Sequence, residues 1–121
     1  MKITPSESLV MDVLWGAERA LTAEEIRADL DEDWTEATVR TFLTRLVSKK
    51  AAAATRDGRR FLYRPLVSRA DYVHAESKTL IDRLFGGQVS PFFAHFSRRE
   101  KLTEDDIKEL ERLVEDLKNG R

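Results

Sequence analysis

This sequence of 121 residues contains no cysteine, and no apolar run in it approaches the ~20 residues that span a bilayer. The lack of cysteine excludes disulfides and thiolate sites for metals or redox reactions, and it suits a reducing cytoplasm. The first residues, Met1-Lys2-Ile3-Thr4-Pro5, are not expected to begin a signal peptide, because no apolar segment follows a basic start. With 36% charged residues, the protein is expected to be soluble and cytoplasmic.

Arrangements typical of enzymes are missing as well. The two histidines, His74 and His95, lie far apart and have no recognisable ligand spacing around them, which favours packing or surface roles over metal binding. The five glycines form no phosphate-binding loop, and there is no nucleophile elbow. No carboxylate has the apolar neighbours of a tuned general acid. The sequence therefore predicts a protein that is not an enzyme and uses no cofactor, metal or small-molecule substrate. A metal-dependent hydrolase built on either histidine would require zinc in the purified protein.

The charge that is present changes sign along the chain. Between residues 7 and 36, ten acidic residues stand against two basic ones, a balance of −8. Between residues 37 and 67, eight basic residues stand against one acid, a balance of +7, although the net charge of the whole chain is −1. Such a block would place one face of the protein on a polyanion, and DNA is the first candidate. The acidic stretch is expected to face away from the DNA.

Three capped helices are predicted over residues 4–17, 22–30 and 35–50. Capping boxes open the first two, at Thr4 and Thr22, and apolar residues recur at helical spacing in all three. The residues expected to point inward are Leu9, Val10, Val13, Leu14, Ala17, Ile26, Leu30, Val39, Phe42, Leu43, Leu46 and Val47.

A β-hairpin is predicted directly after the third helix. The pair Asp57-Gly58 lies between extended segments 53–56 and 59–64, which is a strong hairpin signal, and Pro65 ends the second strand. Three short helices followed by a hairpin make a winged helix-turn-helix, here over residues 1–67. The predicted fold class is therefore mainly α with a small β-hairpin wing, followed by a helical dimerisation segment.

Residues 68–121 are predicted to form that separate helical domain. A capped helix ends at Gly86-Gly87, a short apolar stretch covers residues 92–96, and a last helix over 103–118 has a heptad-like apolar seam. The aromatic residues of the short stretch are read as core rather than as a peptide or ligand pocket. Because a winged helix closes its own core, the seam is expected to pack against a second copy. The residues assigned to this dimer interface are Leu80, Leu84, Phe92, Phe96, Ile107, Leu110, Val114 and Leu117.

The polar face of the third helix carries the sharpest functional signal. Thr41 and Thr44 lie on it with Arg40 and Arg45 beside them, and such side chains suit base edges and phosphates in the major groove. An ordinary solvated face would look similar. The adjacent hairpin favours DNA binding, because its arginines would meet phosphates or the minor groove. These wing residues are Arg56, Arg59 and Arg60. The alternative function is a winged-helix module that binds another protein without sequence-specific DNA binding.

Four segments resemble the penicillinase-repressor family (BlaI/MecI/CopY). They are Leu9–Trp15, Thr38–Leu46, Asp57–Pro65 and Leu102–Ile107 with Leu110. The resemblance covers nearly the whole chain and implies a homodimeric transcriptional repressor that binds a palindromic DNA operator. It implies recognition-helix contacts at Thr38, Arg40, Thr41, Thr44 and Arg45, and wing contacts at Arg59 and Arg60.

The resemblance also bears on how repression would be relieved. In the antibiotic-responsive branch, a membrane sensor metalloprotease cuts an Asn-Phe bond in the C-terminal segment, and the matching position here is His95-Phe96. The asparagine is absent at that position. The copper-responsive branch uses a C-terminal cysteine hook, which this chain lacks. Lys50-Ala51 replaces the Lys-Gly that the family usually has after the third helix, a departure that bears on the turn into the wing.

Overall fold

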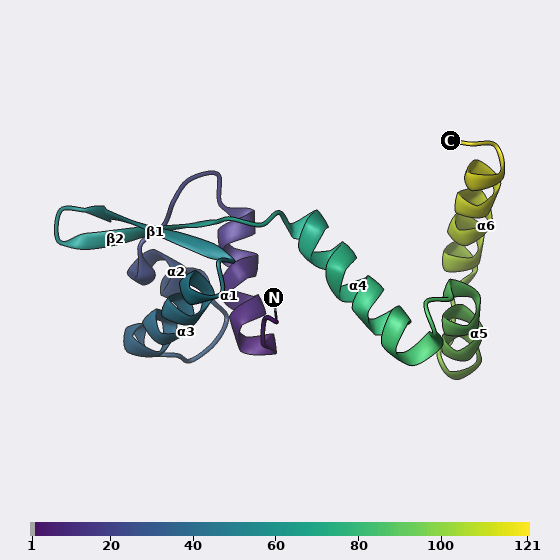
Figure 1. Cartoon of the computed structure of the whole chain (residues 1–121), viewed down its shortest axis with the longest axis horizontal. Helices are drawn as coiled ribbons and strands as arrows, with labels where there is room; N and C mark the ends of the chain where they lie inside the picture. Colours follow the sequence, from purple (N-terminus) through teal and green to yellow (C-terminus); the bar gives the residue numbers. More distant parts are fainter. Residues whose placement is uncertain (1) are drawn as a thin grey trace. The chain divides into compact units, whose positions relative to one another are not determined.

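The structure is a computed structural model that describes residues 2–121. Their contacts divide the chain into two compact units, Met1–His74 and Ala75–Arg121. Figure 1 shows the elements in their order along the chain. They are α1 (Pro5–Gly16), α2 (Ala23–Asp29), α3 (Glu36–Ser48), β1 (Ala52–Asp57), β2 (Arg60–Pro65), α4 (Arg69–Phe85), α5 (Val89–Arg99) and α6 (Glu104–Lys118). The prediction of a mainly helical winged helix-turn-helix is confirmed.

The capping signals position the first helices. The Thr4 hydroxyl accepts a hydrogen bond from the backbone N–H of Glu7 (3.2 Å), and the Glu7 carboxylate accepts one from the backbone N–H of Thr4 (3.0 Å). Thr22 and Glu25 repeat this reciprocal pair at the start of α2, at 3.2 and 2.9 Å. Each box satisfies backbone donors that a helix start otherwise leaves without partners.

The core of the first unit lies among α1, α2, α3 and the base of the hairpin. One inward prediction was wrong: Leu9 is 38% exposed, whereas Met11 is fully buried. The buried face of α1 follows Glu7, Val10, Met11 and Leu14, the i, i+3, i+4, i+7 spacing of one helix face. The apolar core residues are Ile3, Val10, Met11, Leu14, Leu21, Ala23, Ile26, Val39, Leu43, Leu46, Ala51 and Ala52.

The hairpin turns one residue later than Asp57-Gly58 suggests. Asp57 pairs with Arg60 in the antiparallel register, so the two turn residues are Gly58 and Arg59. Gly58 has a φ of +68°, and Arg59 is not among the positive-φ residues. A positive φ at the first turn residue alone is the pattern of a type II′ turn, which requires glycine there.

The base of the hairpin is tied back to the helices. Leu21 and Tyr63 exchange two backbone hydrogen bonds, of 3.0 and 2.7 Å. In the same unit, the Trp15 indole N–H donates to the backbone carbonyl of Val67 (2.8 Å), and its ring contacts that of Tyr72 with centroids 5.3 Å apart. The start of α4 is therefore anchored to α1, while the predicted boundary between residues 67 and 68 stays a prediction.

The passage from α3 to β1 has an unusual backbone. The N–H of Ala51 donates to the carbonyl of Leu46 (2.9 Å) and that of Lys50 donates to Val47 (3.0 Å), which is the Schellman motif. Lys50 has a φ of +65° and occupies the left-handed position that glycine usually takes. The left-handed residue therefore lies one position before Ala51, the residue at which this chain departs from the family's usual Lys-Gly.

The second unit contains the rest of α4 with α5 and α6, and no described residue of these helices is buried. The aromatic residues make a small apolar cluster, with Phe92 5.6 Å from Phe85 and 5.9 Å from Phe96 between ring centroids. Phe96 is still 45% exposed, so the reading of this stretch as a closed core was wrong for the single chain. Within residues 2–121, none of the helices has the length and apolar character needed to cross a membrane.

Candidate nucleic-acid interface

The outer face of α3 presents most of the predicted contacts to solvent. Arg40, Thr41, Thr44 and Arg45 are exposed, and Thr38 is half-buried near the helix start. The Thr41 hydroxyl donates to the backbone carbonyl of Ala37 (3.1 Å), and the Thr44 hydroxyl donates to that of Arg40 (2.9 Å). These bonds use the donor hydrogen of each hydroxyl and leave its acceptor lone pairs and the methyl group for a ligand.

The two arginines of α3 each have a neighbour that orders them. Arg40 forms an ion pair with Glu36 one turn earlier, at 3.3 Å. The Arg45 guanidinium lies over the ring of Phe42, 5.9 Å from its centroid. Both side chains stay mostly exposed to solvent, so both can exchange these neighbours for a phosphate or a base edge.

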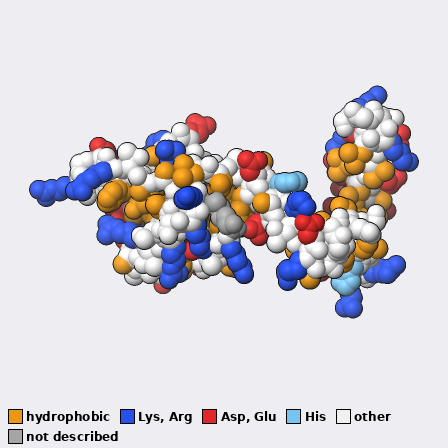
Figure 2. All heavy atoms as spheres, in the orientation of Figure 1, with side chains coloured by type: hydrophobic (Ala, Val, Ile, Leu, Met, Phe, Trp, Pro, Cys, Tyr) orange, Lys and Arg blue, Asp and Glu red, His pale blue; other side chains and the backbone are white. Residues whose placement is uncertain are grey.

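The wing carries the remaining predicted contacts around its turn. Arg56 donates from Nε to the carbonyl of Gly58 (3.0 Å), Arg60 forms an ion pair with Asp57 (3.2 Å), and Arg59 is exposed in the turn itself. Figure 2 shows basic side chains gathered at the free end of the hairpin. Forked cationic groups on a projecting hairpin suit the phosphates that flank a bound helix.

A groove joins the two sets of residues. It runs between the start of α2, the outer face of α3 and strand β2, and we call it the α3–wing groove. In Figure 2 hydrophobic surface is visible in the first unit beside the basic hairpin tip. The residues that line the α3–wing groove are Thr22, Ala23, Glu24, Glu36, Arg40, Thr44, Arg59, Arg60, Phe61 and Tyr63.

The acidic stretch was expected to face away from the DNA, and two of its residues do not face away from the predicted DNA-binding surface. Glu24 and Glu36 line the α3–wing groove together with the arginines. Glu7 is fully buried, and its Oε1 accepts a hydrogen bond from the Lys49 ammonium at the end of α3. Burial raises the pKa of Glu7, but hydrogen bonds from Lys49 and Thr4 outweigh it, so the pKa lies below its ordinary value.

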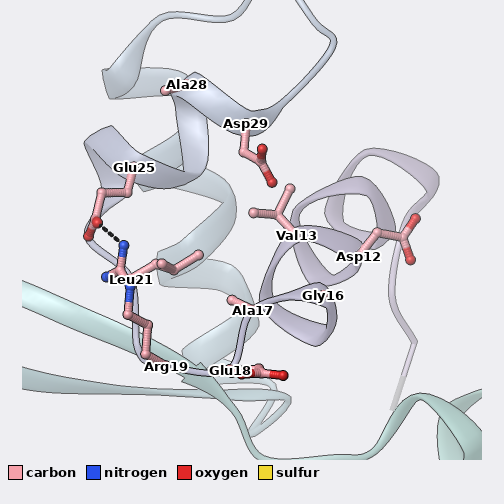
Figure 3. Close-up of a pocket in the computed structure, with 10 residues that line it drawn as sticks. All are labelled: Asp12, Val13, Gly16, Ala17, Glu18, Arg19, Leu21, Glu25, Ala28 and Asp29. Carbon is pink, nitrogen blue, oxygen red and sulfur yellow. Dashed lines mark hydrogen bonds and ion pairs between the residues drawn. The ribbon is translucent and has the colours of Figure 1, made fainter.

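Part of the acidic stretch does gather in a second groove, between α1 and α2. Figure 3 shows Asp12, Glu18, Glu25 and Asp29 around it with a single base, Arg19. Arg19 donates to Glu25 across 2.5 Å, and this hydrogen bond lowers the pKa of Glu25 to about 2. An excess of carboxylates makes this groove unsuited to a polyanion.

The second unit has an apolar groove of its own between α5 and α6. Three of the residues assigned to the dimer interface, Ile107, Leu110 and Val114, line this groove together with Phe93. Of the other predicted residues, Leu80, Leu84 and Leu117 are 39, 57 and 76% exposed. The assignment of these residues to a dimer interface stays a prediction.

The predicted cleavage position lies inside α5. His95 and Phe96 are both exposed, and the His95 ring lies 6.1 Å from that of Phe85 between centroids. No group of three or more metal-ligating side chains occurs within residues 2–121. His74 closes the first unit and His95 belongs to the second.

Sequence reasoning missed the aromatic residues of the α3–wing groove. Phe61 and Tyr63 both line it from β2. Their alternation along the strand is the available signal, because residues i and i+2 share one face of a strand.

The chain is similar in sequence and structure to known penicillinase repressors. The family model described as "Penicillinase repressor" matches residues 3–116. The chain is 28% identical to a penicillinase repressor of Bacillus licheniformis over 99% of this chain and 94% of the relative. It is 30% identical to the methicillin resistance regulatory protein MecI of Staphylococcus aureus over 93% of each. Among solved structures, the monomeric form of the B. licheniformis BlaI in complex with the blaP half-operator is 31% identical, with a TM-score of 0.51 over 60% of this chain and 89% of that one.

Proposed function

The chain belongs to the penicillinase repressor family, whose members are DNA-binding transcriptional repressors rather than enzymes, and on this premise we propose that it binds a palindromic operator as a homodimer in the cytoplasm. The observation that carries the proposal is the α3–wing groove, where Arg40 and Thr44 of the helix meet Arg59 and Arg60 of the wing. A solved relative is described in complex with a half-operator, which supports the same role for this unit.

Each part of this surface has a separate task in the proposal. Helix α3 enters the major groove, where Arg45 and Thr44 read base edges, while Thr38, Arg40 and Thr41 complete the helix contacts. The wing arginines Arg56, Arg59 and Arg60 bind phosphates beside it and fix the register of the helix.

The second unit supplies the two-fold symmetry. Its helices bury no side chain, and Ile107, Leu110, Val114 and Leu117 form an apolar stripe along α6. Packing of this stripe against the same stripe of a second copy would cover both and give an isologous interface. The half-sites of the operator would then lie roughly one or two helical turns apart, in multiples of ~34 Å.

Arg45→Ala tests the DNA-binding part. A duplex selected by the wild-type chain from a random-sequence library serves as the cognate probe, and a scrambled duplex as the non-cognate one. If Arg45 reads a base, the loss is about 1–3 kcal/mol on the cognate duplex and much smaller on the scrambled one. Arg27→Ala, on the exposed surface of α2, is the matched control and leaves both affinities unchanged.

Two outcomes would change this assignment. Equal losses on both duplexes would make Arg45 a positioning contact only. Failure of the wild-type chain to retard any duplex at low salt would overturn the repressor function and favour the module that binds another protein. Specific binding is expected to weaken steeply with salt, because phosphate contacts release counterions.

Charged residues in the seam test the dimer. Leu110→Glu with Leu117→Glu is expected to give monomers in sedimentation, because burying two carboxylates without partners costs more than the interface provides. Leu66→Glu is the control, since Leu66 is 50% exposed in the first unit, outside the seam. A dimer that survives both seam changes removes this role from α6.

Relief of repression by a membrane sensor metalloprotease is the last part of the proposal. Cleavage at His95-Phe96 would sever α5 and remove α6 with its stripe from the rest of the chain. Since the bond lies within a helix, α5 must open locally before it is cut. Purified chain incubated with the membrane fraction of induced cells, followed by mass spectrometry, tests this position directly.

A further inference from the structure

We infer that Phe61 is a further DNA contact, which packs its exposed ring against the apolar part of one nucleotide of the strand held in the α3–wing groove. This inference rests on the proposed operator binding. It adds a contact of a different kind from the polar and cationic ones, because a phenyl ring forms no bond to a phosphate and interacts with sugar carbons or a thymine methyl.

The first support is the exposure of the ring where the fold could have covered it. Phe61 is 45% exposed although twelve of the described apolar residues of the first unit are buried, and the next residue on the same face of β2, Tyr63, is only half-exposed. The ring lines the α3–wing groove and is not one of the residues packed on the core. Its exposed part is therefore available to a ligand lying in that groove.

The second support is the charge around the ring, which indicates what the ligand is. Arg56 is the cross-strand partner of Phe61, and its guanidinium lies 5.9 Å from the ring centroid. Arg59 and Arg60 line the same groove on the wing side, and Arg40 lines it on the helix side. An apolar surface surrounded by arginines fits a chain of phosphates with apolar sugars between them better than it fits an apolar peptide, because the arginines attract phosphates.

The acidic residues of the groove do not reverse this argument. Glu36 is held by its ion pair with Arg40 at 3.3 Å. Glu24 lies at the start of α2, and the arginines of the groove outnumber the two carboxylates by three to two. Asp57 is likewise held by its ion pair with Arg60, and the guanidinium of Arg56 lies over the Phe61 ring itself.

The test compares Phe61→Ala, Phe61→Leu and Arg60→Ala on a duplex selected by the wild-type chain from a random library. Phe61→Ala is expected to weaken binding about tenfold, because the apolar area that the ring buries against the DNA is lost. Phe61→Leu is expected to recover part of that loss. The salt dependence of binding should stay that of the wild type, because no phosphate contact is removed. Arg60→Ala should instead reduce the salt slope by about one counterion.

A measurement on the wild-type chain keeps the inference testable if the variants unfold. With isotope-labelled phenylalanine, nuclear Overhauser contacts from the Phe61 ring to deoxyribose protons or to a thymine methyl are expected in the complex. Replacing thymine with deoxyuridine in the selected duplex separates the two sources, since only a methyl contact is lost. Wild-type affinity in Phe61→Ala, or a ring without contacts to DNA, would overturn the inference and leave operator binding intact. Failure to select any duplex would overturn operator binding itself.

Discussion

The two units of the chain use the same kinds of helix, but only the first one closes a core. Among the described residues, twelve apolar side chains are buried in Met1–His74 and none in the helices of Ala75–Arg121. The second unit has an equally regular apolar pattern, yet Leu84, Val89 and Leu117 are 57, 64 and 76% exposed. An amphipathic helix therefore predicts that a face will be buried, and the partner that buries it need not be in the same chain.

The largest expected effect comes from truncating one leucine in each unit and comparing the two changes in stability. Leu43 is fully buried, so Leu43→Ala is expected to lower the free energy of unfolding of the first unit by about 2–5 kcal/mol, from lost burial and a cavity. Both tryptophans, Trp15 and Trp34, lie in that unit, so urea unfolding followed by tryptophan fluorescence reports it directly.

Leu117→Ala is the matched change in the second unit. Because Leu117 is 76% exposed, the change leaves the tryptophan-detected transition untouched and weakens self-association measured by sedimentation. If Leu117→Ala instead lowered the free energy of unfolding of the monomer at low protein concentration, the second unit would have a core of its own in solution. The contrast between the two units would then fail.

The buried carboxylate of the first unit gives a smaller effect. Glu7 and Glu25 occupy the same capping-box position, and each accepts from one cation, but Glu7 is buried while Glu25 is partly exposed. Glu7→Gln keeps the cap and the shape but leaves Lys49 without its charged partner, at an expected cost of about 2–3 kcal/mol. Glu25→Gln is the control and is expected to cost much less, because its ion pair with Arg19 is solvated.

The pH dependence follows from the direction of the Glu7 pKa. Hydrogen bonds from Lys49 and Thr4 outweigh burial and hold it below the ordinary value of 4.5, so the folded state binds the proton less readily than the unfolded one. Its stabilising contribution is complete above pH 4.5 and is lost as the pH falls through the lowered pKa. Acid unfolding in that window should be less steep in Glu7→Gln. An unchanged pH profile would show that the pair contributes nothing to folding.

Local signals in the sequence predicted the elements well. Threonine caps, apolar spacing and the Asp-Gly pair locate α1, α2, α3 and the hairpin, because each depends on neighbouring residues only. The ion pair of Glu7 with Lys49 joins residues far apart in sequence, and no local pattern predicts it. The same reason explains why Phe61 and Phe93 were missed: each lines a groove made by elements whose packing decides which side chains face it.

The smallest predicted effect concerns the left-handed residue that leads into the wing. Lys50 has a φ of +65°, a conformation that costs a residue with a Cβ about 1–2 kcal/mol, whereas glycine adopts it freely. Since glycine also loses more entropy on folding, Lys50→Gly is expected to stabilise the first unit by about 0.5–1 kcal/mol net. The increase should appear in the tryptophan-detected urea transition and leave self-association unchanged.

Ala51→Gly is the control that locates the left-handed residue. Ala51 is fully buried and is not among the positive-φ residues, so this change is expected to destabilise the unit by about 1 kcal/mol. In the family that this chain resembles, the usual glycine aligns with Ala51. The two variants therefore test whether the left-handed residue of this chain lies at position 50 or at position 51. Stabilisation by Ala51→Gly with none by Lys50→Gly would show that Ala51 is the left-handed residue, and α3 would then end one residue later.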